Sequence, residues 1–213
     1  MGIINKGILG PVSGTVGTVI GGSWKGISYL RSQPASSRTT FSVKQLEQQA
    51  KFALTMRFLQ TMTALISVSF REYAVKMSGF NNAMRYTLVN AVTGIYPTYE
   101  IDYSSALVSR GDLPNASTPT AASSNSGTVD FSWIDNSGMG KAQATDKSIL
   151  VVYSPTRNQC IYTTAGADRN IGGDNISVPS FKGEQVETYI GFVSADGKYI
   201  ASSFYTGQVT VAV

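Results

Sequence analysis

Residues 148–153 read Ser-Ile-Leu-Val-Val-Tyr, and residues 187–193 read Glu-Thr-Tyr-Ile-Gly-Phe-Val. Both runs are short and rich in β-branched and aromatic residues. Turn-forming pairs such as Ser154-Pro155 and Asp196-Gly197 follow them. Segments of this length and composition between turn signals predict β-strands. The C-terminal half of the chain is therefore expected to be built from β-strands.

The same pattern extends over residues 98–213. Turn signals separate the runs, and residues 113–127 are rich in Ser, Thr, Ala and Pro, which predicts a flexible loop. Seven short strands in a segment of this length are typical of an immunoglobulin-like (Ig-like) β-sandwich. The predicted strands are Tyr99–Tyr103 continued by Ala106–Ser109, Thr128–Trp133, Ser148–Tyr153, Gln159–Thr164, Asn175–Val178, Glu187–Val193 and Ala201–Val213.

The order of features in this segment resembles a fibronectin type III domain. Phe131-Ser-Trp133 lies on an early strand, and Leu150–Tyr153 lies centrally. Tyr189–Phe192 and Ser202–Tyr205 lie on the last pair of strands. The resemblance implies an antiparallel β-sandwich, without the Cys pair of antibody-type domains.

Residues 42–97 have the pattern of helices. Apolar residues recur every three or four positions from Leu46 onward, which predicts an amphipathic helix that either runs on to the stop at Ser78-Gly79 or breaks near Ser67-Val-Ser69. A second helix is predicted from Asn81 or Asn82 to Gly94. Two antiparallel helices cannot bury both apolar faces on each other, so this helical hairpin is expected to pack on another surface.

Residues 1–41 have the pattern of a Gly-rich β-arm followed by a linker. Val12 and Val16, then Ile27 and Tyr29, alternate as in β-strands around Gly-Gly and Lys-Gly pairs that predict turns. Glycine at this density leaves strands weakly specified in isolation. The arm is expected to need a partner surface, either in its own chain or in another copy. Taken together, the three blocks predict the α+β fold class.

Composition limits the chemistry that the chain can perform. The chain has 213 residues, of which 42% are hydrophobic, with no His and one Cys, Cys160. These counts exclude Ser-His-Asp and Cys-His catalysis, His metal ligation and an intrachain disulfide.

The charge is unevenly distributed along the chain: residues 1–95 contain ten bases and two acids, a net +8, whereas residues 96–213 contain seven bases and eleven acids, a net −4. This asymmetry indicates either nucleic-acid contact or contact between neighbouring copies, and the alternative is a solvated basic helix face beside a mildly acidic β-domain.

Aromatic and cationic residues occur together in the arm. Trp24, Lys25, Tyr29 and Arg31 are close in sequence, and Arg38 follows in the linker. Rings beside cations are typical of surfaces that stack bases and neutralise phosphates. The alternative is that Trp24 and Tyr29 are core residues while the cations protect strand edges from aggregation. These five are the candidate binding or assembly residues, and no catalytic or metal-ligating residue is predicted.

The whole chain resembles an uncharacterised family that is abundant in Bacteroidota genomes. The resemblance rests on five blocks: residues 14–32, Gln48–Leu54, Ala106–Pro114, Asp146–Pro155 and Gly191–Lys198. It implies a bacterial or bacteriophage origin and no particular activity. The Gln-Gln-Ala-Lys-Phe-Ala helix start is also similar to small phage and prophage structural proteins.

These features predict a non-enzymatic structural protein that self-assembles into a particle or filament, with a phage-like virion component as the most specific form. One alternative is a nucleic-acid-associated module that uses residues 1–95, and another is a surface or carbohydrate-binding Ig-like module. The expected partners are further copies or other structural proteins, and no cofactor is expected. Because neither a signal peptide nor a membrane span is recognisable, the expected location is the cytoplasm or a virion-like particle.

Overall fold

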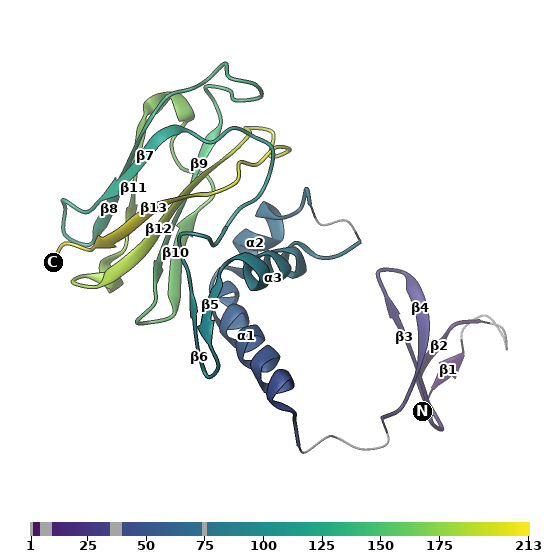
Figure 1. Cartoon of the computed structure of the whole chain (residues 1–213). Helices are drawn as coiled ribbons and strands as arrows, with labels where there is room; N and C mark the ends of the chain where they lie inside the picture. Colours follow the sequence, from purple (N-terminus) through teal and green to yellow (C-terminus); the bar gives the residue numbers. More distant parts are fainter. Residues whose placement is uncertain (1, 5–9, 35–39, 74–75) are drawn as a thin grey trace. The chain divides into compact units, whose positions relative to one another are not determined.

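The computed structural model describes residues 2–4, 10–34, 40–73 and 76–213. The chain divides into two compact units, Met1–Val43 and Lys44–Val213, here called the N-terminal unit and the C-terminal unit. Figure 1 shows the elements of each unit in sequence order. Each unit is described by itself.

The C-terminal unit contains a sandwich of two antiparallel sheets. One sheet has the order β10-β9-β12-β13 and the other has the order β11-β8-β7. The predicted α+β class with an antiparallel Ig-like sandwich is confirmed. The strands are β7 (Ser117–Ala122), β8 (Thr128–Ile134), β9 (Lys147–Ser154), β10 (Gln159–Thr163), β11 (Gly173–Ser177), β12 (Gln185–Val193) and β13 (Phe204–Thr210), with short 3-10 turns at η1 (Arg169–Ile171) and η2 (Pro179–Phe181).

Strand β9 is buried on both of its faces. Leu150 and Val152 point into the core between the two sheets. The alternate residues Ile149, Val151 and Tyr153 point the other way, into a second core that contains the helices. A strand covered on both faces is apolar at successive positions rather than at alternate ones. This explains the continuous apolar run at residues 148–153.

Three helices replace the predicted helical hairpin. The first ends at Gln60, and beyond it the Thr61 hydroxyl donates to the carbonyl oxygen of Phe58 at 2.7 Å. Ser78 rather than Asn81 or Asn82 caps the last helix, and its hydroxyl accepts from the Asn81 amide at 3.2 Å. The helices are α1 (Val43–Gln60), α2 (Thr63–Ser69) and α3 (Gly79–Asn90).

The last helix ends at Asn90 and not at Gly94. Residues after it form the hairpin of β5 (Val92–Ile95) and β6 (Thr98–Ile101), so the predicted boundary between residues 97 and 98 lies in the turn of this hairpin. Gly94 has a φ of +88° and its Cα faces the backbone of Thr98 so closely that a Cβ would collide with it. The glycine therefore serves the hairpin and does not stop a helix.

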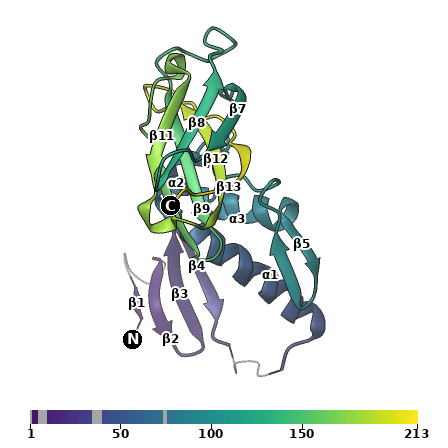
Figure 2. The same cartoon turned by 90° about the vertical axis from the view of Figure 1, so that its left-hand side faces the viewer.

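The helices pack on the sandwich of their own chain, next to the sheet that holds β9 and β12 (Figures 1 and 2). The ring of Phe58 on α1 lies 5.0 Å from that of Tyr153 and 5.9 Å from that of Tyr103, both in edge-to-face geometry. The Tyr189 hydroxyl donates to the Tyr103 carbonyl oxygen at 2.8 Å. The predicted need for a partner surface is thus met within the chain, and the helices no longer argue for assembly.

One strand assignment and one loop assignment were wrong. Ala106–Ser109 forms no strand: it passes between α2 and the segment before β13, where the Ser69 hydroxyl donates to the Val108 carbonyl and the Val108 amide donates to the Ser203 hydroxyl. Within the predicted flexible loop 113–127, β7 pairs with β8. Small polar residues suit an edge strand, and Pro119 lies where the register shifts. This segment therefore has the composition of a loop although it forms a strand.

The N-terminal unit is a four-stranded antiparallel sheet. Lys25 and Gly26 have positive φ angles of 48° and 79°, as a two-residue hairpin turn requires, so the Lys-Gly turn is confirmed. The Gly21-Gly22 pair makes no turn and lies inside a strand. Among the described residues of this unit Gly21 alone is buried, so the sheet has no core of its own. The strands, in spatial order, are β1 (Ile3–Ile4), β2 (Val12–Val16), β3 (Val19–Trp24) and β4 (Ile27–Ser32).

Candidate functional site

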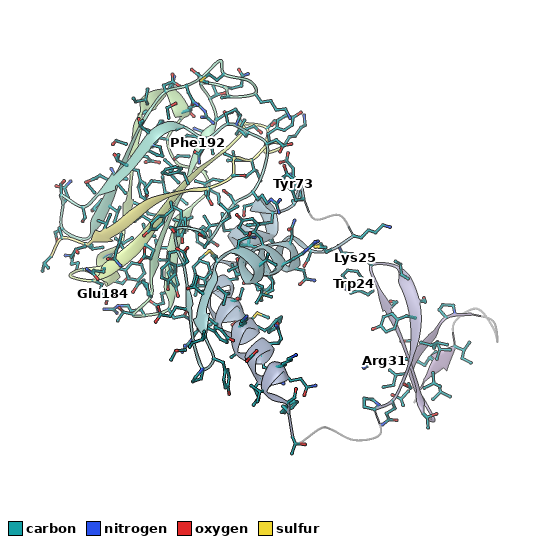
Figure 3. The ribbon with its side chains drawn as sticks, in the orientation of Figure 1. Trp24, Lys25, Arg31, Tyr73, Glu184 and Phe192 are labelled. Carbon is teal, nitrogen blue, oxygen red and sulfur yellow. The ribbon has the colours of Figure 1, made fainter. Side chains whose placement is uncertain are left out.

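The pairing of β3 with β4 places three of the five candidate residues on one face of the N-terminal sheet. Trp24 pairs with Ile27, Gly22 with Tyr29, and Ile20 with Arg31. Directly paired residues share a face, and every second residue along a strand returns to it. Trp24, Tyr29 and Arg31 therefore share what we call the aromatic face; Figure 3 labels Trp24 and Arg31.

The aromatic face is exposed rather than packed. The side chains of Trp24 and Tyr29 are each about half exposed, which contradicts the alternative that they are core residues. A Cβ on Gly22 would lie 3.0 Å from the end of the Tyr29 ring, so this glycine lets the ring lie across the strand. The rings are thus held flat on the sheet but remain open to a partner.

Cations border these rings. The Lys25 ammonium lies 5.1 Å from the centroid of the Trp24 ring, a cation–π distance. Arg31 is exposed at the other end of the face. Arg38 falls outside the described residues. Rings and cations are therefore brought together for four of the five candidate residues.

The opposite face of the sheet is also apolar and exposed. It carries Val16, Val19 and Leu30, all classed among the exposed large hydrophobic residues. A hollow of about 520 Å³ lies beside Pro11, Val12 and Leu30. Covering solvent-exposed apolar residues removes them from water and lowers the free energy. Both faces of this sheet therefore favour contact with another surface.

In the described part of the arm, no ion pair neutralises the positive charge. Residues 1–43 contain four bases and no acid. Among the described residues, all four ion pairs lie between residues 146 and 198. Four of the eleven acids of the C-terminal half are thus paired within their own domain, which reduces the charge that could attract the basic half of a neighbouring copy.

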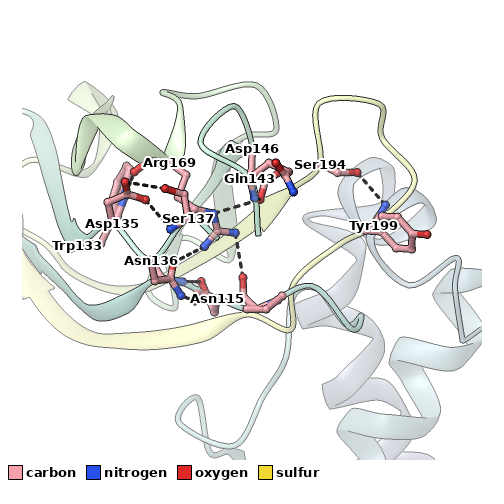
Figure 4. A network of polar contacts seen from close by, with 12 residues as sticks. Asn115, Trp133, Asp135, Asn136, Ser137, Gln143, Asp146, Arg169, Ser194 and Tyr199 are labelled. Carbon is pink, nitrogen blue, oxygen red and sulfur yellow. Dashed lines mark hydrogen bonds and ion pairs between the residues drawn. The ribbon is translucent and has the colours of Figure 1, made fainter. Parts of the chain in front are cut away.

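A buried polar network in the sandwich was missed by the sequence reasoning. Arg169 is fully buried and donates its Nε proton to the Asp146 carboxylate at 3.1 Å. The guanidinium also donates to the Asn136 side-chain oxygen at 2.7 Å (Figure 4) and to the Pro114 carbonyl at 2.9 Å, and it lies 4.2 Å from the Phe192 ring centroid. Burial lowers the pKa of Arg169, and the neighbouring Asp146 charge opposes this shift. Residues 23 positions apart carry no sequence signal of such a pair.

Other chemistry is sparse in the part of the chain that the structure describes. Burial raises the pKa of the Cys160 thiol to about 12, so its reactive thiolate is scarce at neutral pH. No group of three or more Cys, Asp or Glu side chains in the described ranges is placed to hold a metal ion. None of the described helices is long and apolar enough to span a bilayer.

Comparison with known proteins gives a family but no activity. No curated protein matches the chain. A solved fibronectin type III domain of human collagen alpha-1(XX) is similar at 9% identity and a TM-score of 0.35, over 48% of this chain and 89% of that domain. Residues 11–207 match a family model described as a family of unknown function, DUF6266, so the chain belongs to that family.

Proposed function

We propose that the chain is a non-enzymatic structural protein that assembles with further copies into a particle or filament, such as a component of a phage-like virion. The N-terminal sheet makes the contact. The observation that carries this proposal is the sheet without a core, which exposes large apolar side chains on both faces. Covering each Ile or Leu would contribute about 1.5–3 kcal/mol.

The charge of the sheet favours one kind of contact over another. Two copies of the segment 1–43, which has four bases and no acid, repel each other. A contact between the sheet of one copy and a different surface of the next copy avoids this repulsion. Such heterologous contacts generate rings or filaments.

The test is the mass of the purified full chain by light scattering over a concentration series, with electron microscopy of the same samples. Wild-type chain is expected to form multimers. Leu30→Lys introduces a charge on the exposed sheet, where the side chain is 62% exposed, and is expected to shift the chain to monomers. Val89→Lys is the matched control on α3, at 76% exposed, and should assemble as wild type does. A wild-type monomer at every concentration, or equal assembly by Leu30→Lys, would contradict the proposal.

A second candidate is single-stranded nucleic-acid binding, which the shared face of Trp24, Tyr29 and Arg31 favours. It predicts that a labelled oligothymidine binds the full chain and that affinity falls as salt rises from about 50 to 200 mM. Trp24→Ala should weaken binding by about tenfold or more through lost stacking. Fluorescence anisotropy measures both effects, and absence of binding at the lower salt removes this candidate.

A further inference from the structure

The two sheets of the sandwich differ in what covers their outer faces. The helices pack on the four-stranded sheet, and the core that they form with it contains no residue of β7, β8 or β11 (Figure 1). In β8, Val129, Phe131 and Trp133 point into the core between the sheets, so the alternate residues point outward. Among the described residues of the C-terminal unit, the three-stranded sheet therefore has no second layer on its outer face.

This outer face, here called the Asp130 face, is flat. The strand register places Asp130 between Ala122 on β7 and Asn175 on β11, and Ser132 comes next on the same side of β8. Side chains this short let another sheet approach to the spacing of about 10 Å at which two sheets pack. Ile134, at the end of β8, is 61% exposed and adds an apolar contact to this face.

The Asp130 face is also negatively charged. Strands β7, β8 and β11 contain two acids, Asp130 and Asp174, and no base, and Asp135 directly follows β8. None of these three carboxylates takes part in an ion pair within the described ranges. Unpaired negative charge on a flat face with an exposed isoleucine favours a partner that is both basic and apolar.

We propose that the N-terminal sheet of one copy packs on the Asp130 face of the next copy. This inference rests on the proposed function and names the surface that receives the sheet. The face of the sheet that carries Val19 and Leu30 meets Ile134, so that apolar side chains of both copies leave water. The two sheets then stack face to face, as the sheets of a sandwich do.

Charge selects this pairing over contact between two N-terminal sheets. Lys25 and Arg31 are the bases in the described part of the N-terminal unit, which contains no acid. Because that sheet is a single layer, their charges act on a partner at either face, at separations near the Debye length of about 10 Å at 0.1 M salt. Asp130 and Asp135 supply the opposite charge. The contact joins two different surfaces, so it repeats from copy to copy.

The test combines two blocked chains that complement each other. Ile134→Lys blocks the Asp130 face and leaves the N-terminal sheet intact, whereas Leu30→Lys blocks the sheet and leaves the Asp130 face intact. Light scattering of each full-length variant alone is expected to show monomers at concentrations where the wild-type chain assembles. An equimolar mixture is expected to form heterodimers and nothing larger, because one productive contact remains between the two variants.

Two further variants accompany this experiment. Ile95→Lys is the matched control, since Ile95 is 79% exposed but lies at the end of β5, and it should assemble as the wild type does. Asp130→Lys reverses charge on the proposed contact and is the second blocking variant, used where circular dichroism shows that Ile134→Lys is not folded. It should raise the concentration of half-assembly by about tenfold or more and should form the same heterodimer with Leu30→Lys.

The outcomes separate this inference from the proposed function. Assembly of the folded Asp130-face variants at wild-type concentrations, with Leu30→Lys monomeric, overturns the inference and leaves the proposed function standing. Monomeric variants whose mixture forms no heterodimer also overturn it, because the sheet and the Asp130 face are then not partners. A wild-type chain that stays monomeric overturns both.

Discussion

Arg169→Met is expected to lower the free energy of unfolding by about 3–5 kcal/mol, because it leaves the Asp146 carboxylate buried without its countercharge. It also removes the donors that satisfy Asn136 and the Pro114 carbonyl. Urea unfolding of the full chain, followed by far-UV circular dichroism, measures the change. Met has about the volume of the aliphatic part of Arg. The loss in the free energy of unfolding therefore measures the missing charge and hydrogen bonds more than a cavity.

Two control variants isolate the buried charge as the cause. Lys198→Met breaks an exposed ion pair with Asp196 and should lower the free energy of unfolding far less than Arg169→Met does. Asp146→Leu combined with Arg169→Met removes both charges and should recover much of the stability lost in the single variant. Equal losses for Arg169→Met and Lys198→Met would show that the buried pair contributes no special stability.

Phe58→Ala is expected to lower the free energy of unfolding by about 3–5 kcal/mol, because it leaves a cavity in the core between the helices and the sandwich. Phe58 is 1% exposed, whereas Phe52, one and a half helical turns earlier on α1, is 48% exposed. Phe52→Ala is therefore the matched control and should change stability by no more than about 0.5 kcal/mol.

The same experiment tests whether helices and sandwich unfold together. In a Trp24→Phe background, fluorescence reports the buried Trp133 between the sheets, while far-UV circular dichroism reports the helices. Because both cores share β9 and β12, the two signals should follow one transition, and Phe58→Ala should shift both. Separate transitions, with only the helical signal shifted, would contradict a single cooperative C-terminal unit.

The strands that carry strong apolar runs were predictable to within a few residues. The predicted Thr128–Trp133 and Ser148–Tyr153 differ from β8 and β9 by one residue at the ends. Strand β7 was not predictable, because an edge strand of Ser, Thr, Pro and Ala has no apolar alternation and owes its extended form to pairing with β8. The start of the last helix was missed for a similar reason, since Ser78 caps it through a single hydrogen bond.

The candidate residues of the arm were partly predictable. The two-residue turn pairs Trp24 with Ile27. The strand period of two then places Tyr29 and Arg31 on the same face as Ile27. Whether their side chains would be buried was left open, because burial depends on what else covers the sheet. The pairing of Arg169 with Asp146 was out of reach, since these residues are brought together only by the folded sandwich.

The sequence by itself determined the strand runs of the sandwich, the presence of amphipathic helices and the charge and aromatic content of the arm. These properties are local, because backbone periodicity and turn chemistry are set by neighbouring residues. The tertiary structure alone decided that the helices are covered by the sandwich of their own chain, that the N-terminal sheet has no core of its own, and that Arg169 meets Asp146 in the interior. Burial arises from contacts between residues far apart in the chain, so only the folded molecule decides which apolar faces and which charges are removed from water.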